Sequence, residues 1–312
     1  MKRMMKGAVI ASLMLATWVW GGPFNAKLVS GDAIWAMHLD AETFRTSTLG
    51  KLMLQENQDA ESLKQLKAFE EMFGMDPQTD LHAVTAYGAG IEPEASVILV
   101  NGKLNPAKLV EKVKTMPAYQ LAKHGNREIH SWENEGEGAA ERVYGVILDR
   151  NSAIIGQTLK SVKKAIDVAD GKQKNLSQGG INTKPLSVGG VMMAVTADLS
   201  NVDLSANPML AANNVSAKSV TIQVRESEGN FSIKAAVKQN SAQEAEQSLT
   251  LLNGMLGMVM MQTQQQNPPV ADVMKAITIK RDNDALLLNV TYPATKLAAL
   301  LKSAMREPVK TE

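Results

Sequence analysis

The sequence predicts an α+β protein of two layers, in which antiparallel sheets carry helices on one face. Short β-type runs come in pairs that are joined by turn residues, and stretches of helical periodicity follow these pairs. The order of elements in the first half returns in the second half, which predicts a tandem duplication of a β-α-β-β-α-β-β-α unit. Strands that pair with their neighbours in sequence favour antiparallel sheets.

The N-terminus has the pattern of an export signal. The basic residues Lys2, Arg3 and Lys6 precede an apolar run over 7–20, which is shorter than the ~20 residues that a spanning helix needs. We therefore expect a signal peptide over 1–26 and a location in the periplasm or outside the cell, with an N-terminal inner-membrane anchor as the alternative.

The cleavage position within this signal stays open. Small residues stand at the three plausible positions before a cut, which are Gly21, Gly22 and Ala26. Bulky neighbours fit the small-x-small rule badly at all three. No transmembrane span is expected in the mature chain.

The first unit is predicted over 27–170. Asp40 stands at the end of a strand where a helix N-cap is expected, and Asn105 with Pro106 marks the start of a later helix. Two helices are expected between Leu49 and Phe73. The expected strands are 33–39, 83–87, 96–100, 119–123, 128–132, 142–148 and 153–156, and the later helices are 106–115 and 159–168.

A linker rich in Gly, Lys, Gln and Asn is predicted over 171–190, and the second unit over 191–312. The first strand of the second unit, 192–198, ends on Asp198. The first strand of the first unit likewise leads into an aspartate, Asp40. The other expected strands are 219–224, 231–237, 276–280 and 285–290, with a long helix over 242–264, a polar loop over 262–269 and a final helix.

Composition excludes several classes of function. Lys and Arg number 33 against 32 Asp and Glu, so the net charge of +1 gives no field that favours nucleic acid. The absence of cysteine removes disulfides, thiolate chemistry and a lipidated cysteine. No nucleotide-binding glycine loop and no Gly-x-Ser-x-Gly elbow occurs, and no cofactor is expected.

Several segments together resemble a known group of proteins. They are the strand ending in Asp40, the sequence Thr48-Leu49-Gly50, the segments 73–77 and 80–81, and the strand 84–88. In this combination the chain is similar to exported bacterial proteins of uncharacterised activity that contain duplicated α+β units, most clearly over 35–132. The resemblance implies a fold and no activity.

Histidine and carboxylate residues are the candidates for metal or acid–base chemistry. If His38, His82 and His130 converged, they would offer imidazole ligands for zinc or copper, with Glu133 completing the set. Their spacing matches no metal motif, and structural roles explain them more simply. Asp40 and Asp198 would form an acid–base pair if the repeats faced each other, but N-capping accounts for Asp40 without chemistry.

The most unusual feature is a methionine-rich helix. Met255, Met258, Met260 and Met261 stand among leucines and valine, so that apolar side chains occupy nearly all faces. Such a surface can bind a peptide, lipid or second subunit, and thioethers also bind Cu(I). Burial between the sheet and neighbouring helices is the simpler expectation.

The sequence therefore predicts a non-enzymatic binding or interaction module of the periplasm or cell envelope. Its partner is not predictable, although an envelope protein or a hydrophobic ligand fits the composition. One alternative is a carrier of lipids or other hydrophobic ligands that uses the Met-rich helix. A metal- or carboxylate-dependent hydrolase is the other alternative.

Overall fold

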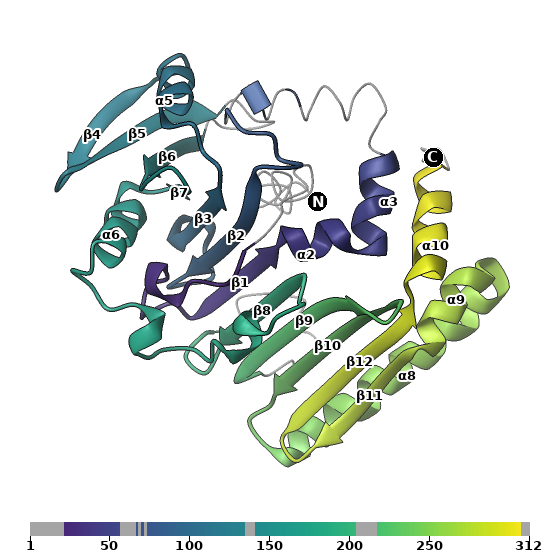
Figure 1. Cartoon of the computed structure of the whole chain (residues 1–312). Helices are drawn as coiled ribbons and strands as arrows, with labels where there is room; N and C mark the ends of the chain where they lie inside the picture. The colour runs from purple at the N-terminus through teal and green to yellow at the C-terminus, as the bar shows by residue number, and fades with distance from the viewer. Residues whose placement is uncertain are drawn as a thin grey trace. The chain divides into compact units, whose positions relative to one another are not determined.

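The structure, a computed structural model, describes residues 22–56, 67, 70, 71, 74–134, 141–203 and 217–306 (Figure 1). The chain divides into two compact units. The first contains the described residues up to Arg45 and from Asn57 to Gly189, and the second contains Thr46–Glu56 and the chain from Gly190 onward. Most of the expected signal peptide, the residues 63–66, 69, 72 and 73 that were expected to be helical, and the expected loop over 135–140 lie outside the described residues.

An antiparallel sheet forms the body of the first unit. Its strands are β1 (Trp35–Asp40), β2 (Leu81–Gly88), β3 (Ser96–Gly102), β4 (Gln120–His124), β5 (Arg127–Asn134), β6 (Glu141–Ile147) and β7 (Ser152–Gly156). They lie in the order β1-β2-β3-β7-β6-β5-β4. Every neighbouring pair is antiparallel, both where the strands are consecutive in sequence and where β3 pairs with β7 across a longer connection.

Short helices accompany this sheet. They are the 3-10 turns η1 (Ala26–Leu28), η2 (Pro93–Ala95), η3 (Leu176–Gln178) and η4 (Lys184–Ser187), and the α-helices α2 (Ala41–Thr46), α5 (Pro106–Lys114) and α6 (Leu159–Ala169). The Asn105 side chain accepts a hydrogen bond from Lys108 N at 3.2 Å, so α5 begins where the Asn-Pro step predicts. Ile154, Val162 and Ile166 are fully buried and form the centre of the core.

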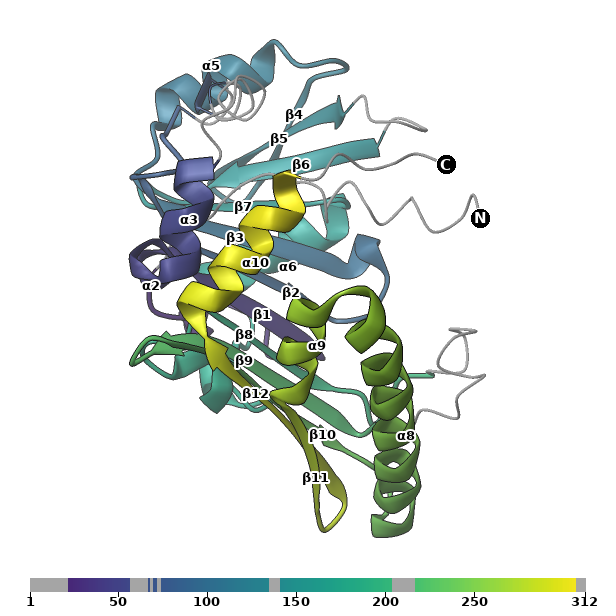
Figure 2. The same ribbon diagram turned by 90° about the vertical axis from the view of Figure 1, so that its right-hand side faces the viewer.

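The second unit has five described strands. They are β8 (Met193–Asp198), β9 (Ser219–Ser227), β10 (Asn230–Lys238), β11 (Ile277–Asp282) and β12 (Ala285–Pro293), in the order β11-β12-β10-β9-β8. Its helices are α3 (Thr48–Glu56), α8 (Ala242–Gln266), α9 (Pro268–Lys275) and α10 (Ala294–Arg306). Figure 2 shows α8 as the long green helix whose chain turns back into α9.

These observations confirm the α+β class and the antiparallel sheets. The five strands of the second unit follow the same spatial order as β1, β2, β3, β7 and β6 in the first, where β5 and β4 extend the edge. A shared strand order is what a duplicated unit predicts. The duplication and its boundaries themselves stay predictions.

The prediction of a loop over 262–269 is wrong. Helix α8 continues to Gln266, and α9 begins at Pro268 with Asn267 as its N-cap. The Asn267 side chain accepts from Val270 N at 3.4 Å, and Pro268 occupies the first turn, where its missing N–H costs nothing. The same Asn-Pro pair predicts α5, so the signal was present in the sequence.

Helix α3 belongs to the second unit although its sequence lies among first-unit segments. The Ser47 hydroxyl caps it by accepting from Gly50 N at 2.9 Å. Thr48 N and Thr48 Oγ1 donate to the Glu226 carboxylate of β9 at 2.9 Å and 2.6 Å. A carboxylate at this end also matches the helix dipole, and α3 packs beside α10.

Candidate functional site

Helix α8 packs on the second sheet through one narrow face. Ala245 is fully buried, and Leu249, Leu256 and Met260 are half-buried. These four residues stand at i, i+4, i+11 and i+15, which is the spacing of a single helix face. This face contacts β11, β12 and α9. An ordinary amphipathic helix needs only this one apolar face, and its remaining surface is polar.

The outward-facing surface of α8 is also apolar. Six large apolar side chains are exposed there, and we call them the outer face: Leu251, Leu252, Met255, Met258, Val259 and Met261. Met258 is 61% and Met261 68% exposed. They make up most of the exposed large hydrophobic side chains in the described part of the chain, so the exposure is concentrated on this one helix.

The expectation that the Met-rich helix is buried is therefore wrong for three of its four methionines. Only Met260 turns toward the sheet, because its position continues the line of Ala245 and Leu256. Met255, Met258 and Met261 point away from that line. A 3.6-residue repeat buries only about one third of a helix that packs on a single side.

The outer face also lacks charge. No Asp, Glu, Lys, Arg or His occurs from Gln247 to Ala271, so charged heads do not interrupt the apolar surface. The flexible thioether side chains of Met255, Met258 and Met261 adapt to partners of different shape. The outer face is suited to an apolar, uncharged partner.

Two glycines lower the stability of α8, and no close packing contact requires them. A Cβ atom added at Gly254 or Gly257 would meet no atom within 4 Å. We expect Gly254→Ala and Gly257→Ala each to stabilise the second unit by about 0.5–1 kcal/mol, because alanine loses less backbone entropy in a helix. Thermal unfolding followed by circular dichroism would measure this gain.

Gly229→Ala is the matched control for these two variants. Gly229 is equally uncrowded, but its φ of +75° strains any residue that has a Cβ. This variant should lose stability while the two helix variants gain it. A loss at Gly254 and Gly257 as well would show that α8 needs flexibility there.

The histidines expected as metal ligands have separate partners. His38 on β1 lies with Nδ1 2.9 Å from Thr85 Oγ1 and Nε2 2.9 Å from Gly22 O. His82 on β2 pairs with Glu42 at 3.0 Å. His130 on β5 lies 3.0 Å from the Tyr119 hydroxyl.

Glu133, the fourth expected ligand, is bound by Arg142 at 2.9 Å. Within the ranges that the structure describes, no group of three or more His, Cys, Asp or Glu side chains is arranged to hold a metal ion. The arrangement thus gives each histidine a local hydrogen-bonding role and brings no ligand set together.

Burial lowers the pKa of both His38 and His130 below the ordinary histidine value. The unfolded chain then binds more protons than the folded one at mildly acidic pH, so folding stability falls as pH drops below the unfolded value of about 6.5. We expect urea midpoints of the first unit to decrease from pH 7.5 to pH 5.5. The double variant His38→Gln/His130→Gln should flatten this slope, and an unchanged slope would contradict the assignment.

The two aspartates at strand ends have local roles. Asp40 Oδ1 accepts from Thr43 N at 2.9 Å, which is the capping geometry expected of it. Asp198 Oδ1 accepts from Ser200 N at 3.0 Å, and this hydrogen bond holds the pKa of Asp198 below its usual range. Both carboxylates satisfy backbone N–H groups of the turn that follows them.

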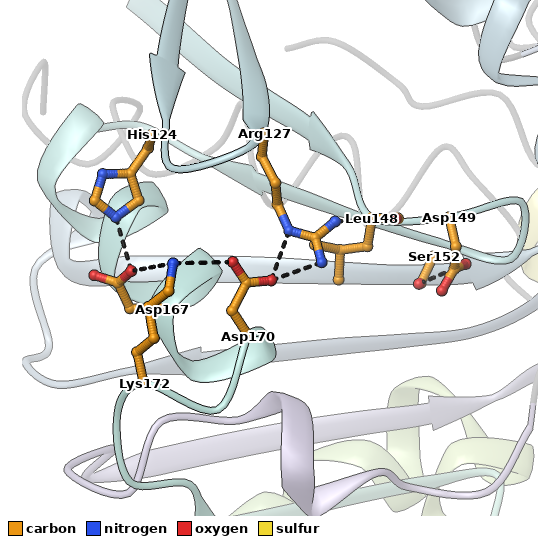
Figure 3. Close-up of polar contacts among 8 residues, drawn as sticks. All are labelled: His124, Arg127, Leu148, Asp149, Ser152, Asp167, Asp170 and Lys172. Atoms are coloured by element: carbon orange, nitrogen blue, oxygen red, sulfur yellow. Dashed lines mark hydrogen bonds and ion pairs between the residues drawn. The ribbon is translucent and has the colours of Figure 1, made fainter.

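A charged cluster joins the β4–β5 turn to the end of α6 (Figure 3). His124 Nε2 lies 2.8 Å from Asp167 Oδ1, and Arg127 donates through Nε and Nη2 to Asp170 Oδ1 at 2.8 Å and 2.7 Å. Lys172 lies 3.3 Å from Asp170. The Arg127 guanidinium holds the pKa of the Asp170 carboxyl below its ordinary value.

This charged cluster is balanced within itself. Two carboxylates face Arg127 and Lys172, and the remaining Arg127 Nη1 donates to Leu148 O at 3.0 Å. A hollow of about 460 Å³ beside it is lined by Gly125, Asn126, Arg127, Asp170 and Lys172, a set without a hydroxyl nucleophile. The cluster therefore fits a structural role, in which it holds the β4–β5 turn to the end of α6. Sequence reasoning missed it because His124 and Asp167 are 43 residues apart.

The first unit also contains an apolar pocket between α5 and its sheet. Leu109, Val113 and Met116 line it from the helix side, and Val146, Ile154 and Trp132 from the strands, while His130 supplies a polar group in the wall. Its cavity measures about 60 Å³. A cavity of this size lined by apolar groups is one that water does not fill favourably.

The fold and these sites define an α+β protein with an exposed apolar helix. No protein-family model and no curated protein matches the chain. Among solved structures it is similar to the Treponema protein TP0453: crystal form III gives a TM-score of 0.52 at 10% identity, covering 90% of this chain and 98% of that one.

Two further crystal structures of TP0453 give lower scores. Crystal form I has a TM-score of 0.48 at 12% identity with coverage of 90% and 98%, and form IV has 0.46 at 11% with coverage of 90% and 97%. At such low identity the likeness to form III shows the fold alone. In the described part of the chain, no helix is both long and apolar enough to cross a membrane.

Proposed function

We propose that this protein is an exported, non-enzymatic interaction module of the cell envelope, which docks an apolar protein surface on the outer face of α8. The observation that carries this proposal is the outer face itself: six large apolar side chains are exposed on one uncharged helix surface. Large exposed apolar patches mark interaction sites in soluble proteins. The N-terminal export pattern supports the location.

The physical basis is burial of apolar area on docking. Each Met or Leu of the outer face that becomes fully buried contributes about 1.5–3 kcal/mol relative to full exposure, and about half of this for a side chain already half-covered. No charged group lies on α8 beyond Glu246, so docking desolvates no charge there. The partner surface that fits best is likewise apolar and uncharged.

Photo-cross-linking tests the docking directly. A photoreactive amino acid at Met258, in the centre of the outer face, should give one discrete protein adduct in cells of the source organism. The same group at Gln264, which is exposed on another side of α8, is the matched control and should give none. An adduct of twice the chain's mass would identify the partner as a second copy.

The variant Met255→Gln/Met258→Gln should abolish the adduct when the photoreactive group is placed at Leu251. Both side chains are exposed, so the variant should keep its stability within about 0.5 kcal/mol per site. Equal adducts at 258 and 264, or none at either, would overturn the proposal. An adduct with lipid instead of protein would favour the second candidate.

Carriage of a hydrophobic ligand on the outer face is that second candidate, and the exposure of Met255, Met258 and Met261 favours it. An apolar fluorescent probe such as a phenylnaphthylamine should bind the protein and lose affinity at least tenfold in Met255→Gln/Met258→Gln. Val113→Phe, which fills the pocket beside α5, is the control and should bind the probe as the wild type does, because that pocket of about 60 Å³ is too small for the probe. Unchanged binding in Met255→Gln/Met258→Gln would remove this candidate.

A further inference from the structure

The last residues of the expected export signal, from Gly22 to Ala26, are part of the first unit. The Gly22 carbonyl oxygen lies 2.9 Å from His38 Nε2, and the other imidazole nitrogen lies 2.9 Å from Thr85 Oγ1. His38 is only 5% exposed, so water reaches its ring poorly. Loss of Gly22 would leave a buried imidazole nitrogen without its partner, which is costly.

Phe24 and Asn25 make further contacts that hold the N-terminal segment on the first unit. The Phe24 ring meets the His38 ring edge-on, with centroids 5.6 Å apart and planes inclined at 74°. The Asn25 side chain accepts from Lys27 N at 3.1 Å and caps η1, and its backbone oxygen accepts from Leu28 N at 3.1 Å. These contacts position η1 for its packing against α6 and η3.

The chain after η1 is fully incorporated into the unit. Val29 is completely buried, and its carbonyl oxygen accepts from Leu176 N at 2.9 Å. Ser30 forms a β-bridge with Asn175. The described chain is thus held by the first unit from Gly22 onward, with no free spacer before η1.

The three sequence-compatible cuts differ in what they remove from this arrangement. A cut after Ala26 removes Gly22, Phe24 and the Asn25 cap, and a cut after Gly22 removes the partner of His38 Nε2. A cut after Gly21 keeps every one of these contacts. It also places Val19 three residues before the cut, where the other two cuts place the larger Trp20 and Phe24.

We propose that a signal peptidase of the cell envelope cuts the chain between Gly21 and Gly22. Water adds across this peptide bond, which leaves a carboxylate on Gly21 and an amino group on Gly22. The inference rests on the proposed export, and it moves the end of the signal from the expected residue 26 to residue 21. Gly22 to Leu28 then belong to the mature protein as its first structural segment.

Intact mass spectrometry of the exported protein tests this inference. The full chain is expressed in a bacterium, the envelope and periplasm are separated from the cytoplasm, and the N-terminus is read from the mass. A chain that begins at Gly22 is the expected result. A chain in the envelope fraction that begins at Pro23 or Lys27, or that keeps Met1, overturns the cut while leaving export intact.

If the uncut chain is found only in the cytoplasm, the proposed export is overturned. The proposed cut is then overturned as well, because it depends on export. Paired variants locate the cut independently of the mass. Gly21→Leu places a bulky side chain directly before the proposed cut and should slow processing at least tenfold, whereas Ala26→Leu should be processed as the wild type is. The reverse pattern would overturn the proposal.

Gly22→Leu separates a processing effect from a folding effect. A Cβ at residue 22 would lie 3.7 Å from His82 Cβ, which is an ordinary contact, so the first side-chain carbon of the variant meets no clash. It changes the residue after the proposed cut and should still give a chain that begins at residue 22. Accumulation of the Gly22→Leu precursor to the level of Gly21→Leu would place the cut after residue 22 and overturn the proposal.

Discussion

Ile154→Ala is expected to lower the free energy of unfolding of the first unit by about 3–4 kcal/mol. Substitutions of buried isoleucine or leucine by alanine cost about 2–5 kcal/mol, and the cost rises with the volume of the cavity that remains. Ile154 is fully buried on β7, where its backbone neighbours are Leu99 on β3 and Val146 on β6. It also lines the existing pocket under α5, so the new void would enlarge a cavity that is already present.

Tryptophan fluorescence in urea would measure this loss selectively. Two of the four tryptophans, Trp35 and Trp132, lie in the first unit, and the other two, Trp18 and Trp20, lie in the expected signal peptide. The mature second unit therefore contributes no tryptophan signal. Leu121→Ala is the control because Leu121 is 47% exposed on β4, and it should shift the unfolding free energy by at most about 0.5 kcal/mol. Equal losses in the two variants would contradict the structure's placement of Ile154.

Glu226→Ala should destabilise the second unit by about 2–3 kcal/mol and expose α3 to proteolysis. The Glu226 carboxylate accepts hydrogen bonds from both Thr48 N and Thr48 Oγ1. Hydrogen bonds to charged groups contribute about 1.5–3 kcal/mol, and the helix dipole adds to the attraction at this end. Removing the carboxylate leaves the first turn of α3 with only the Ser47 cap.

Amide hydrogen exchange and limited proteolysis of residues 46–56 would detect this effect. Glu226→Gln keeps the shape of the side chain and should lose about half as much stability, because it retains one oxygen without the charge. Glu228→Gln is the matched control: Glu228 lies exposed at the β9–β10 turn, where its backbone oxygen accepts from Asn230 Nδ2 at 3.3 Å. Faster exchange in Glu228→Gln alone would show that α3 does not depend on Glu226.

Element types were predictable where the deciding signal is local. The Asn105–Pro106 step located the start of α5, and β-type runs with turn residues between them located the β2–β3 and β9–β10 pairs. The Asn267–Pro268 step has the same chemistry, yet the Gln-rich run before it suggested a loop and α9 was missed. A cap and a proline at N1 are stronger evidence for a helix than the polarity of the preceding residues is against one.

Site residues were predictable only as residue types. The sequence singled out Met255, Met258, Met260 and Met261 as unusual, but it could not say which of them the sheet covers. Three of the four histidines suggested a ligand set, whereas the structure gives each of the four its own hydrogen-bonding partner. The charged cluster of His124, Arg127, Asp167 and Asp170 leaves no pattern in sequence, because its members come from a turn and a helix end 43 residues apart.

The sequence by itself determined the α+β class, most of the strands and helices, the absence of cysteine and the lack of charged residues on α8 after Glu246. These properties depend on composition, on residue periodicity and on caps within a few residues of each other. Only the tertiary structure decided that Thr46–Glu56 joins the second unit, that Gly22 and Phe24 pack on His38, and that the outer face of α8 is uncovered. Each of these depends on contacts between segments distant in sequence, such as Thr48 with Glu226, and residue spacing does not record such contacts.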